Sequence, residues 1–355
     1  MSLTIANPGN NQAVSRPWQS RLAALFEVCG VYMVGMLIGY IVALILGLKP
    51  ANPINVLAAN PGADLLEMSR DMAILLLIQY GGILPLAFLV GWWRSRRKLA
   101  DYGLTTARQP LSFHLLWGVV LFAVASLPFK LVVLIDHIVP LGPKAVTQQI
   151  VYGLDWSDYR FWIFMAVGSF LLIPVVEELF FRGYVQTRLA QGFGAPAAIL
   201  TTAFFFEFSH GQYLTLSAWN ASMLLGGVFS ALMWGYAFYR TRSLIAVMVA
   251  HALVNSPVRG LADFILPVLM LGIVILYRRQ VAEEFRKLGS LLKFEISSRA
   301  ATILAVVAMT IFAILVGVSQ DVALILGVVL MIAAVILEVL EKRKDRRAAQ
   351  LPSAA

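Results

Sequence analysis

Residues 161–182 read FWIFMAVGSFLLIPVVEELFFR, a mostly apolar stretch that ends in two acidic residues and an arginine. The run 161–181, which includes the two acidic residues, is as long as a membrane-spanning helix requires, which is about 20 residues. Glu177, Glu178 and Arg182 stand at its end. An ionisable side chain inside a membrane is costly and is therefore a functional candidate. The stretch predicts a transmembrane helix that carries polar chemistry at one end.

The rest of the chain repeats this apolar pattern. Its 355 residues are 60% hydrophobic and 13% charged, and the mean hydropathy is +0.80. Soluble domains are about 45–50% apolar and about 25% charged, so these values exclude an ordinary cytosolic enzyme and a disordered protein. Runs of about span length occupy residues 22–48, 71–93, 111–135, 161–181, 195–213, 218–239, 243–257, 261–277, 300–318 and 321–340. We predict an all-α polytopic membrane protein with about ten transmembrane helices and an active site between the helices of the central bundle.

The basic residues favour one orientation of these helices. If the N-terminus is cytoplasmic, the cytoplasmic segments hold 22 of the 28 Lys and Arg residues. This asymmetry is typical of the positive-inside rule and predicts a multi-pass protein of the cell membrane with both termini in the cytoplasm. The net charge of +9 is spread between apolar runs, so the expected partner is the lipid bilayer and not a nucleic acid.

The same map divides the chain into segments. We predict a cytoplasmic tail at 1–20, N-terminal transmembrane helices at 21–159, a core with the polar motifs at 160–257, C-terminal transmembrane helices at 258–341 and a second cytoplasmic tail at 342–355. The polar stretch from Glu283 to Glu295 carries large apolar residues at Phe285, Leu288, Leu291, Leu292 and Phe294. This pattern predicts an amphipathic helix on the cytoplasmic membrane face.

The spacing of the acidic residues assigns them to different partners. Glu178 and Arg182 are four residues apart, which suits an ion pair along a helix. Glu177 points about 100° away from its neighbour. If helices meet at the turn Gly192-Phe193-Gly194, then Glu177 and His210 each lie about 16 residues, or roughly 24 Å, from that turn. We therefore expect Glu178 to face Arg182 and Glu177 to face His210.

Two further motifs follow in the same core segment. Phe206 precedes His210 by four residues. His251 precedes Asn255 by the same spacing, so these two polar residues share a helix face. Glu207, three residues before His210, is expected either to orient that imidazole or, with more weight, to lie at a lipid-facing or solvated edge. We expect the other intramembrane ionisable residues to lie near span ends: Lys130, Asp136, His137, Asp263 and Glu338.

The motifs together resemble the CPBP family of intramembrane proteases, which includes the Ras-converting CAAX endopeptidases and bacterial Abi proteins. The family pattern is Glu-Glu-x-x-x-Arg, Phe-x-x-x-His and His-x-x-x-Asn, and this chain has all three in order within about residues 160–257. The resemblance implies an intramembrane endopeptidase. Eukaryotic members remove the last three residues of prenylated CAAX proteins, and bacterial relatives are linked to bacteriocin self-immunity or peptide processing.

Peptide hydrolysis requires an activated water, a proton donor and stabilisation of an oxyanion. We expect Glu177 to act as general base with His210 positioning the water, and Glu178 and Arg182 to support them. The resemblance implies that His251 and Asn255 line the oxyanion site. The substrate would be a peptide or membrane protein, membrane-associated or CAAX-like.

No metal is expected, because the chain has no His-Glu-x-x-His zinc signature. The alternative is a divalent metal such as zinc held by Glu177, His210 and His251. Two other functions stay open. A transporter or channel would use the buried Glu and His residues as a proton relay, and a scaffold would keep the fold without catalysis.

Overall fold

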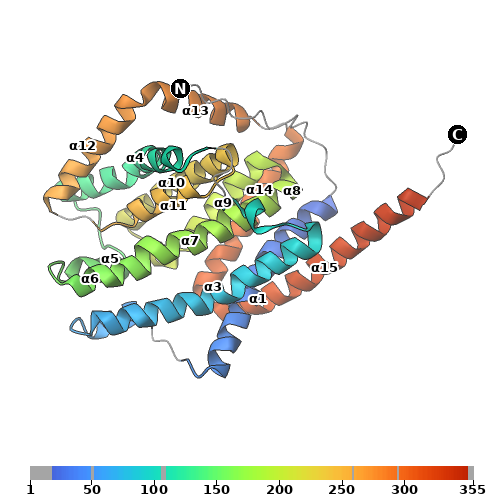
Figure 1. The fold of residues 1–355 in the computed structure, drawn as a ribbon, viewed down its shortest axis with the longest axis horizontal. Helices are drawn as coiled ribbons and strands as arrows, with labels where there is room; N and C mark the ends of the chain where they lie inside the picture. The colour runs from blue at the N-terminus through green and yellow to red at the C-terminus, as the bar shows by residue number, and fades with distance from the viewer. Residues whose placement is uncertain (1–17, 49–51, 105–108, 258–259, 294–295, 351–355) are drawn as a thin grey trace.

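The computed structural model describes residues 18–48, 52–104, 109–257, 260–293 and 296–350 (Figure 1). The predicted tail at 1–20 lies almost wholly outside the described residues, as does Phe294 of the predicted amphipathic helix. The described residues form helices and turns without a strand. In chain order the helices are α1 (Trp18–Ile45), α2 (Pro53–Ala59), α3 (Leu65–Ser95), η1 (Leu99–Tyr102), α4 (Leu111–Ile138), α5 (Val146–Gly153), α6 (Tyr159–Met165), η2 (Ala166–Leu171), α7 (Leu172–Glu178), η3 (Leu179–Gln186), α8 (Thr187–Phe193), α9 (Ala195–Phe208), η4 (Gly211–Tyr213), α10 (Ala218–Thr241), α11 (Ile245–Val254), α12 (Leu261–Leu276), α13 (Arg278–Leu291), α14 (Ile296–Val318) and α15 (Gln320–Gln350).

The protein is an all-α polytopic membrane protein, as the sequence predicts, but ten spans are not confirmed. Among the described residues, seven helices are long and apolar enough to cross a membrane, or eight if the bent pair of α12 and α13 is one span. Two predicted spans are short helices: α9 has 14 residues and α11 has 10. At 1.5 Å per residue they extend about 21 and 15 Å, whereas the hydrocarbon core is about 30 Å thick.

The early end of α9 has a local cause. The Ser209 hydroxyl donates a hydrogen bond to the carbonyl of Phe206, and Nδ1 of His210 lies 2.9 Å from the same oxygen. Side chains that bond to nearby carbonyls compete with the helical ladder. The helix therefore stops at Phe208, and His210 lies just beyond it.

The helices form three neighbouring groups (Figure 1). In one, α1 packs against α3 and α15; in another, α4 packs against α10, α11 and α12. The segment from α6 to α9, together with α14, lies between these groups. The motif residues of α7, η3 and α11 are therefore enclosed by helices from distant parts of the chain.

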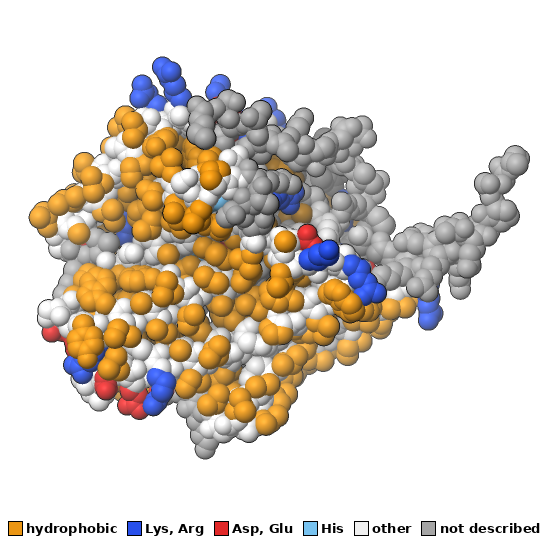
Figure 2. All heavy atoms as spheres, viewed as in Figure 1, with side chains coloured by type: hydrophobic (Ala, Val, Ile, Leu, Met, Phe, Trp, Pro, Cys, Tyr) orange, Lys and Arg blue, Asp and Glu red, His pale blue; other side chains and the backbone are white. Residues whose placement is uncertain are grey.

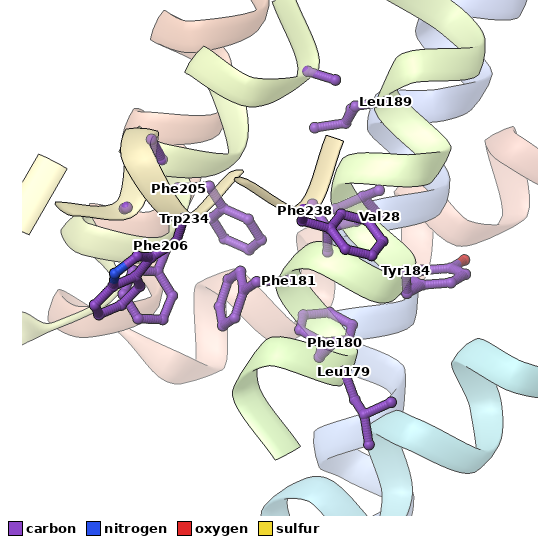
Figure 3. Packing of buried hydrophobic residues seen from close by; sticks show 14 of the residues in the cluster. Val28, Leu179, Phe180, Phe181, Tyr184, Leu189, Phe205, Phe206, Trp234 and Phe238 are labelled. Carbon is purple, nitrogen blue, oxygen red and sulfur yellow. The ribbon is translucent and has the colours of Figure 1, made fainter. Parts of the chain in front are cut away.

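Aromatic side chains fill the core beside the motif residues (Figure 3). Phe181 makes edge-to-face contacts with Phe205 and Phe206, with ring centroids 5.4 and 4.9 Å apart. Tyr32 of α1 contacts Phe180 and Phe205, each at 5.7 Å. Such pairs are worth about 0.5–1.5 kcal/mol beyond the area that they bury. They fix η3, α9 and α1 relative to one another.

The face shown in Figure 2 is largely apolar. Large hydrophobic side chains on α10, α12 and α15 are exposed, including Leu225, Val268 and Ile325. A soluble monomer rarely exposes a continuous apolar surface of this kind. Lipid chains are the environment that this surface fits.

A buried ion network joins four helices at one end of the molecule. Glu27 of α1 lies 2.9 Å from Arg188 of α8 and 3.3 Å from Arg94 of α3, and it accepts a hydrogen bond from Tyr184. Arg188 also lies 3.8 Å from Glu338 of α15, which therefore pairs within the bundle instead of simply reaching out from a span end. The network couples the first and last spans to the core segment.

Glycines allow α1 and α3 to cross at close range. A Cβ atom on Gly82 would overlap the backbone carbonyl of Gly35, whereas a Cβ on the adjacent Gly81 would meet nothing within 4 Å. Since overpacking usually costs about 1–3 kcal/mol, we expect Gly82→Ala to lower the melting temperature of the detergent-solubilised protein. Gly81→Ala is the matched control and should melt close to the unmodified protein. Equal melting of the two variants would contradict this crossing.

Candidate active site

The acidic motif lies on a helix that two π-helical segments interrupt. Residues Tyr159–Phe193 form one span, in which the π-helical turns η2 and η3 precede and follow α7. Glu177 and Glu178 are the last residues of α7. Single π-helical turns occur frequently at functional sites, because the wider winding changes the direction of the following side chains. Here the change falls between the two glutamates and the turns that contain Arg182.

Glu178 holds two partners through one oxygen. Its Oε1 accepts a hydrogen bond from Arg182 at 3.0 Å and lies 2.8 Å from Nδ1 of His251. Glu178 and Arg182 are fully buried, and His251 is nearly so. The predicted pairing of Glu178 with Arg182 is confirmed. The contact with His251 is an addition, and it joins the first motif to the third.

Glu177 is the more accessible of the two glutamates. Its side chain is 14% exposed, against 0% for Glu178. Oε1 accepts a hydrogen bond from Tyr80 of α3 at 3.1 Å, and Oε2 lies 3.7 Å from Nε2 of His251. Oε2 is buried and has no hydrogen-bond partner among the described residues. Glu177 thus presents an unoccupied acceptor beside an imidazole.

Two aromatic rings enclose the charged groups. Trp234 of α10 stacks on His251 with ring centroids 4.7 Å apart. The guanidinium of Arg182 lies over Phe206 at 4.4 Å and over Trp234 at 5.3 Å, and Figure 3 shows these two aromatic side chains next to each other. A cation over an aromatic face is stabilised further when both are removed from water. The rings therefore help to keep Arg182 charged without solvent.

The Phe206 ring contacts both histidines of the motifs. The Phe206 ring is 4.9 Å from the His210 ring and 5.9 Å from the His251 ring, both edge to face. No ion pair of 4 Å or less joins Glu177 to His210 in the described part of the chain. The contacts of Glu177 are with Tyr80 and His251, and the expectation that it also faces His210 stays a prediction.

Asn255 caps the helix that carries His251. Its backbone N–H donates to the carbonyl of His251, and its Nδ2 donates to the carbonyl of Ser169 in η2 at 3.1 Å. The side chain of Asn255 therefore ties α11 to the same span that carries Glu177. A carboxamide nitrogen has two N–H donors, so a second one remains for another acceptor.

Glu207 is buried, contrary to the prediction of a lipid-facing or solvated edge. Its side chain lies directly against Gly227 of α10, where any Cβ atom would overlap the carboxyl group. Glu207 also interacts electrostatically with His210, Glu177 and Arg182. The small residue at position 227 provides the space for this carboxylate. Glu207 thus belongs to the polar cluster.

The residues that would ligate a metal do not converge. Among the described residues, no group of three or more His, Cys, Asp and Glu side chains is arranged to hold an ion. His251 uses Nδ1 for Glu178, and the His210 ring is directed at a backbone carbonyl. The alternative zinc set of Glu177, His210 and His251 is not among any such group in the described part of the chain, and it stays untested. Hydrolysis without a metal remains a prediction.

Sequence reasoning missed two members of the site. Tyr80 lies in a mostly apolar run of α3, outside the core segment, and the adjacent Gln79 is the one polar residue beside it. Trp234 likewise stands in an apolar run on α10. Gly235, which follows it, and the pair Gly226-Gly227 are the local signal of close packing on that helix. A contact between two crossing helices cannot be predicted from the spacing of residues in the sequence.

The fold and the cluster define a class: a polytopic helical membrane protein with buried acid–imidazole pairs between its spans. Residues 159–257 match the family described as Rce1-like, Type II CAAX prenyl endopeptidase Rce1-like. This match confirms, over that segment, the family resemblance that the three motifs indicate. Comparisons with curated proteins and with solved structures give no match.

Proposed function

We propose that this chain is a CAAX-type intramembrane endopeptidase that hydrolyses a peptide bond close to the membrane. The family match supports the reaction class, since its printed description is of CAAX prenyl endopeptidases. The observation that carries the proposal is Oε2 of Glu177, which accepts no hydrogen bond from the described residues and lies 3.7 Å from Nε2 of His251. The cytoplasmic position of both termini and the plasma membrane as location are part of the same proposal.

Glu177 is the general base of this mechanism. A separation of 3.7 Å between its Oε2 and Nε2 of His251 is too long for a direct hydrogen bond, but one water can bond to both atoms. Glu177 takes a proton from that water as the water oxygen attacks the peptide carbonyl carbon. Tyr80 holds the other oxygen of the carboxylate and fixes its direction.

Glu178 acts through His251. A carboxylate only accepts hydrogen bonds, so Nδ1 of His251 carries the hydrogen and donates it to Glu178. This bond fixes the direction of Nε2 towards Glu177, in the way that a buried carboxylate orients an imidazole in other hydrolases. Glu178 is therefore a positioning residue, and Arg182 balances its charge.

The oxyanion and the leaving amine need donors. The free N–H of Asn255 and a protonated Nε2 of His251 are the donors that we assign to the oxyanion. The proton that Glu177 has taken then passes to the amine as the carbon–nitrogen bond breaks. His210, whose Nδ1 is bonded to the Phe206 carbonyl, positions the water or the amine through Nε2.

A panel of peptides tests the reaction class. The purified protein in liposomes is mixed with a prenylated CAAX peptide, the same peptide without the prenyl group and an unrelated transmembrane peptide. We expect mass spectrometry to detect the released C-terminal tripeptide from the prenylated peptide. Absence of any cleavage together with proton-driven uptake of a solute would instead support a proton-relay transporter.

A further inference from the structure

A cavity lies between α4, α10 and α13, and none of the motif residues lines it. Its volume is about 120 Å³. Its walls are apolar side chains of all three helices, including Trp117, Leu121, Ala237, Phe285 and Leu288. A dry cavity of about 150 Å³ admits a molecule the size of benzene. This one therefore admits a stretch of hydrocarbon chain and not a folded peptide.

The cavity adjoins a hollow that is polar and basic. The hollow is lined by Tyr236, Tyr239, Arg240, Glu283, Arg286, Lys287, Ser290 and Leu291. Tyr236 and Arg240 line both spaces, so the two adjoin at these residues. We take the polar hollow as the entrance to the apolar cavity.

One arginine at the entrance has no acidic partner among the described residues. Glu284 lies 3.0 Å from Arg240 and 2.9 Å from Lys287, and Glu283 lies 2.6 Å from Lys287. Burial raises the pKa of Glu284, but hydrogen bonds from Lys287, Arg240 and Tyr236 outweigh it and hold that pKa below its usual range. Arg286 is exposed and makes no ion pair with the described residues. The entrance thus carries a net positive charge.

Helix α13 is amphipathic, as the sequence predicts, and it forms one wall of this site. The helix bends 80° from α12, and its apolar residues Val281, Phe285 and Leu288 all line the cavity. Phe285 is still 41% exposed, so the protein covers only part of this face. Figure 2 shows Lys and Arg side chains along the edge of the molecule at which Figure 1 places α13, beside an apolar surface.

We infer that this cavity and its basic entrance bind one anionic phospholipid, with an acyl chain in the cavity and the phosphate at Arg286. The occupant must have a hydrocarbon chain and an anion a short distance apart, and a bilayer supplies both in one molecule. A basic amphipathic helix at a membrane surface is attracted to anionic lipid. The inference concerns a site separate from Glu177 and does not depend on the proposed protease activity.

Native mass spectrometry of the delipidated full-length protein tests the site. Phosphatidylglycerol or phosphatidylcholine is added, and bound lipid is counted. We expect one tightly retained phosphatidylglycerol per chain. Ala237→Trp should abolish this retention by filling the cavity, whereas Ala308→Trp, on the exposed face of α14, should not.

A second variant, which removes one charge, tests the site even if Ala237→Trp fails to fold. Arg286→Gln should lower the preference for phosphatidylglycerol over phosphatidylcholine about five-fold, since one basic residue near an anionic surface contributes about 1 kcal/mol. Arg279→Gln, on the same helix but outside the entrance, should leave the preference unchanged. Equal retention of both lipids by the unmodified protein overturns the inference. So does displacement of phosphatidylglycerol by a neutral prenyl alcohol at equal concentration.

Discussion

Glu177→Gln is expected to reduce peptide cleavage about 10²–10⁴-fold while the protein stays folded. Glutamine keeps the size of the side chain and can still accept the hydrogen bond from Tyr80. It cannot take a proton from water. Because Glu177 lies at the accessible side of the cluster, its charge is not needed to neutralise Arg182. The measurement is the initial rate of tripeptide release, with the melting temperature recorded on the same sample.

Either of two results would contradict the assignment of Glu177 as the general base. Cleavage by Glu177→Gln at nearly the unmodified rate would exclude Glu177 as the base. A fall in melting temperature that accounts for the lost activity would make the residue structural.

Glu178→Gln is expected to destabilise the protein strongly. The variant leaves Arg182, which is fully buried, without its charged partner, and it also removes the charged acceptor of His251. Breaking a buried ion pair from one side costs about 3–5 kcal/mol. Since His251 loses its orientation too, activity should fall more than the folded fraction does. The measurements are the melting temperature and the cleavage rate per folded molecule.

Glu283→Gln is the matched control for this destabilisation. Glu283 and Lys287 have the same four-residue spacing, but the glutamate side chain is 54% exposed. Exposed pairs are worth about 0–1 kcal/mol, so this variant should melt close to the unmodified protein. If the two variants shift the melting temperature equally, the buried pair has no special role.

The helical class and most spans could be predicted because hydrophobicity alone determines them. The lengths of α9 and α11 could not. Hydropathy does not detect the contacts that Ser209 and His210 make with the carbonyl of Phe206 at the end of α9. It also does not show that α11 begins after Leu244 and ends before Asn255. Both segments are apolar enough to resemble spans and too short to be spans.

Within the site, contacts along one helix were predictable and contacts between helices were not. The pairing of Glu178 with Arg182 follows from their spacing, and it is present at 3.0 Å. The partner of Glu177 depends on how α7 and α11 cross, which has no signature in the sequence. The burial of Glu207 depends on Gly227 of another helix, and the bond from Tyr80 comes from a span outside the matched segment.

Cleavage of a prenylated CAAX peptide in ¹⁸O-labelled water tests the central claim most directly. The account predicts that the unmodified protein releases a tripeptide and leaves one ¹⁸O atom in the new carboxyl group, because water is the nucleophile. It predicts that Glu177→Gln, folded to the same extent, gives neither product within the same time. Release of the labelled product at equal rates by both proteins, or no release by the unmodified protein, would contradict a protease centred on Glu177 and His251.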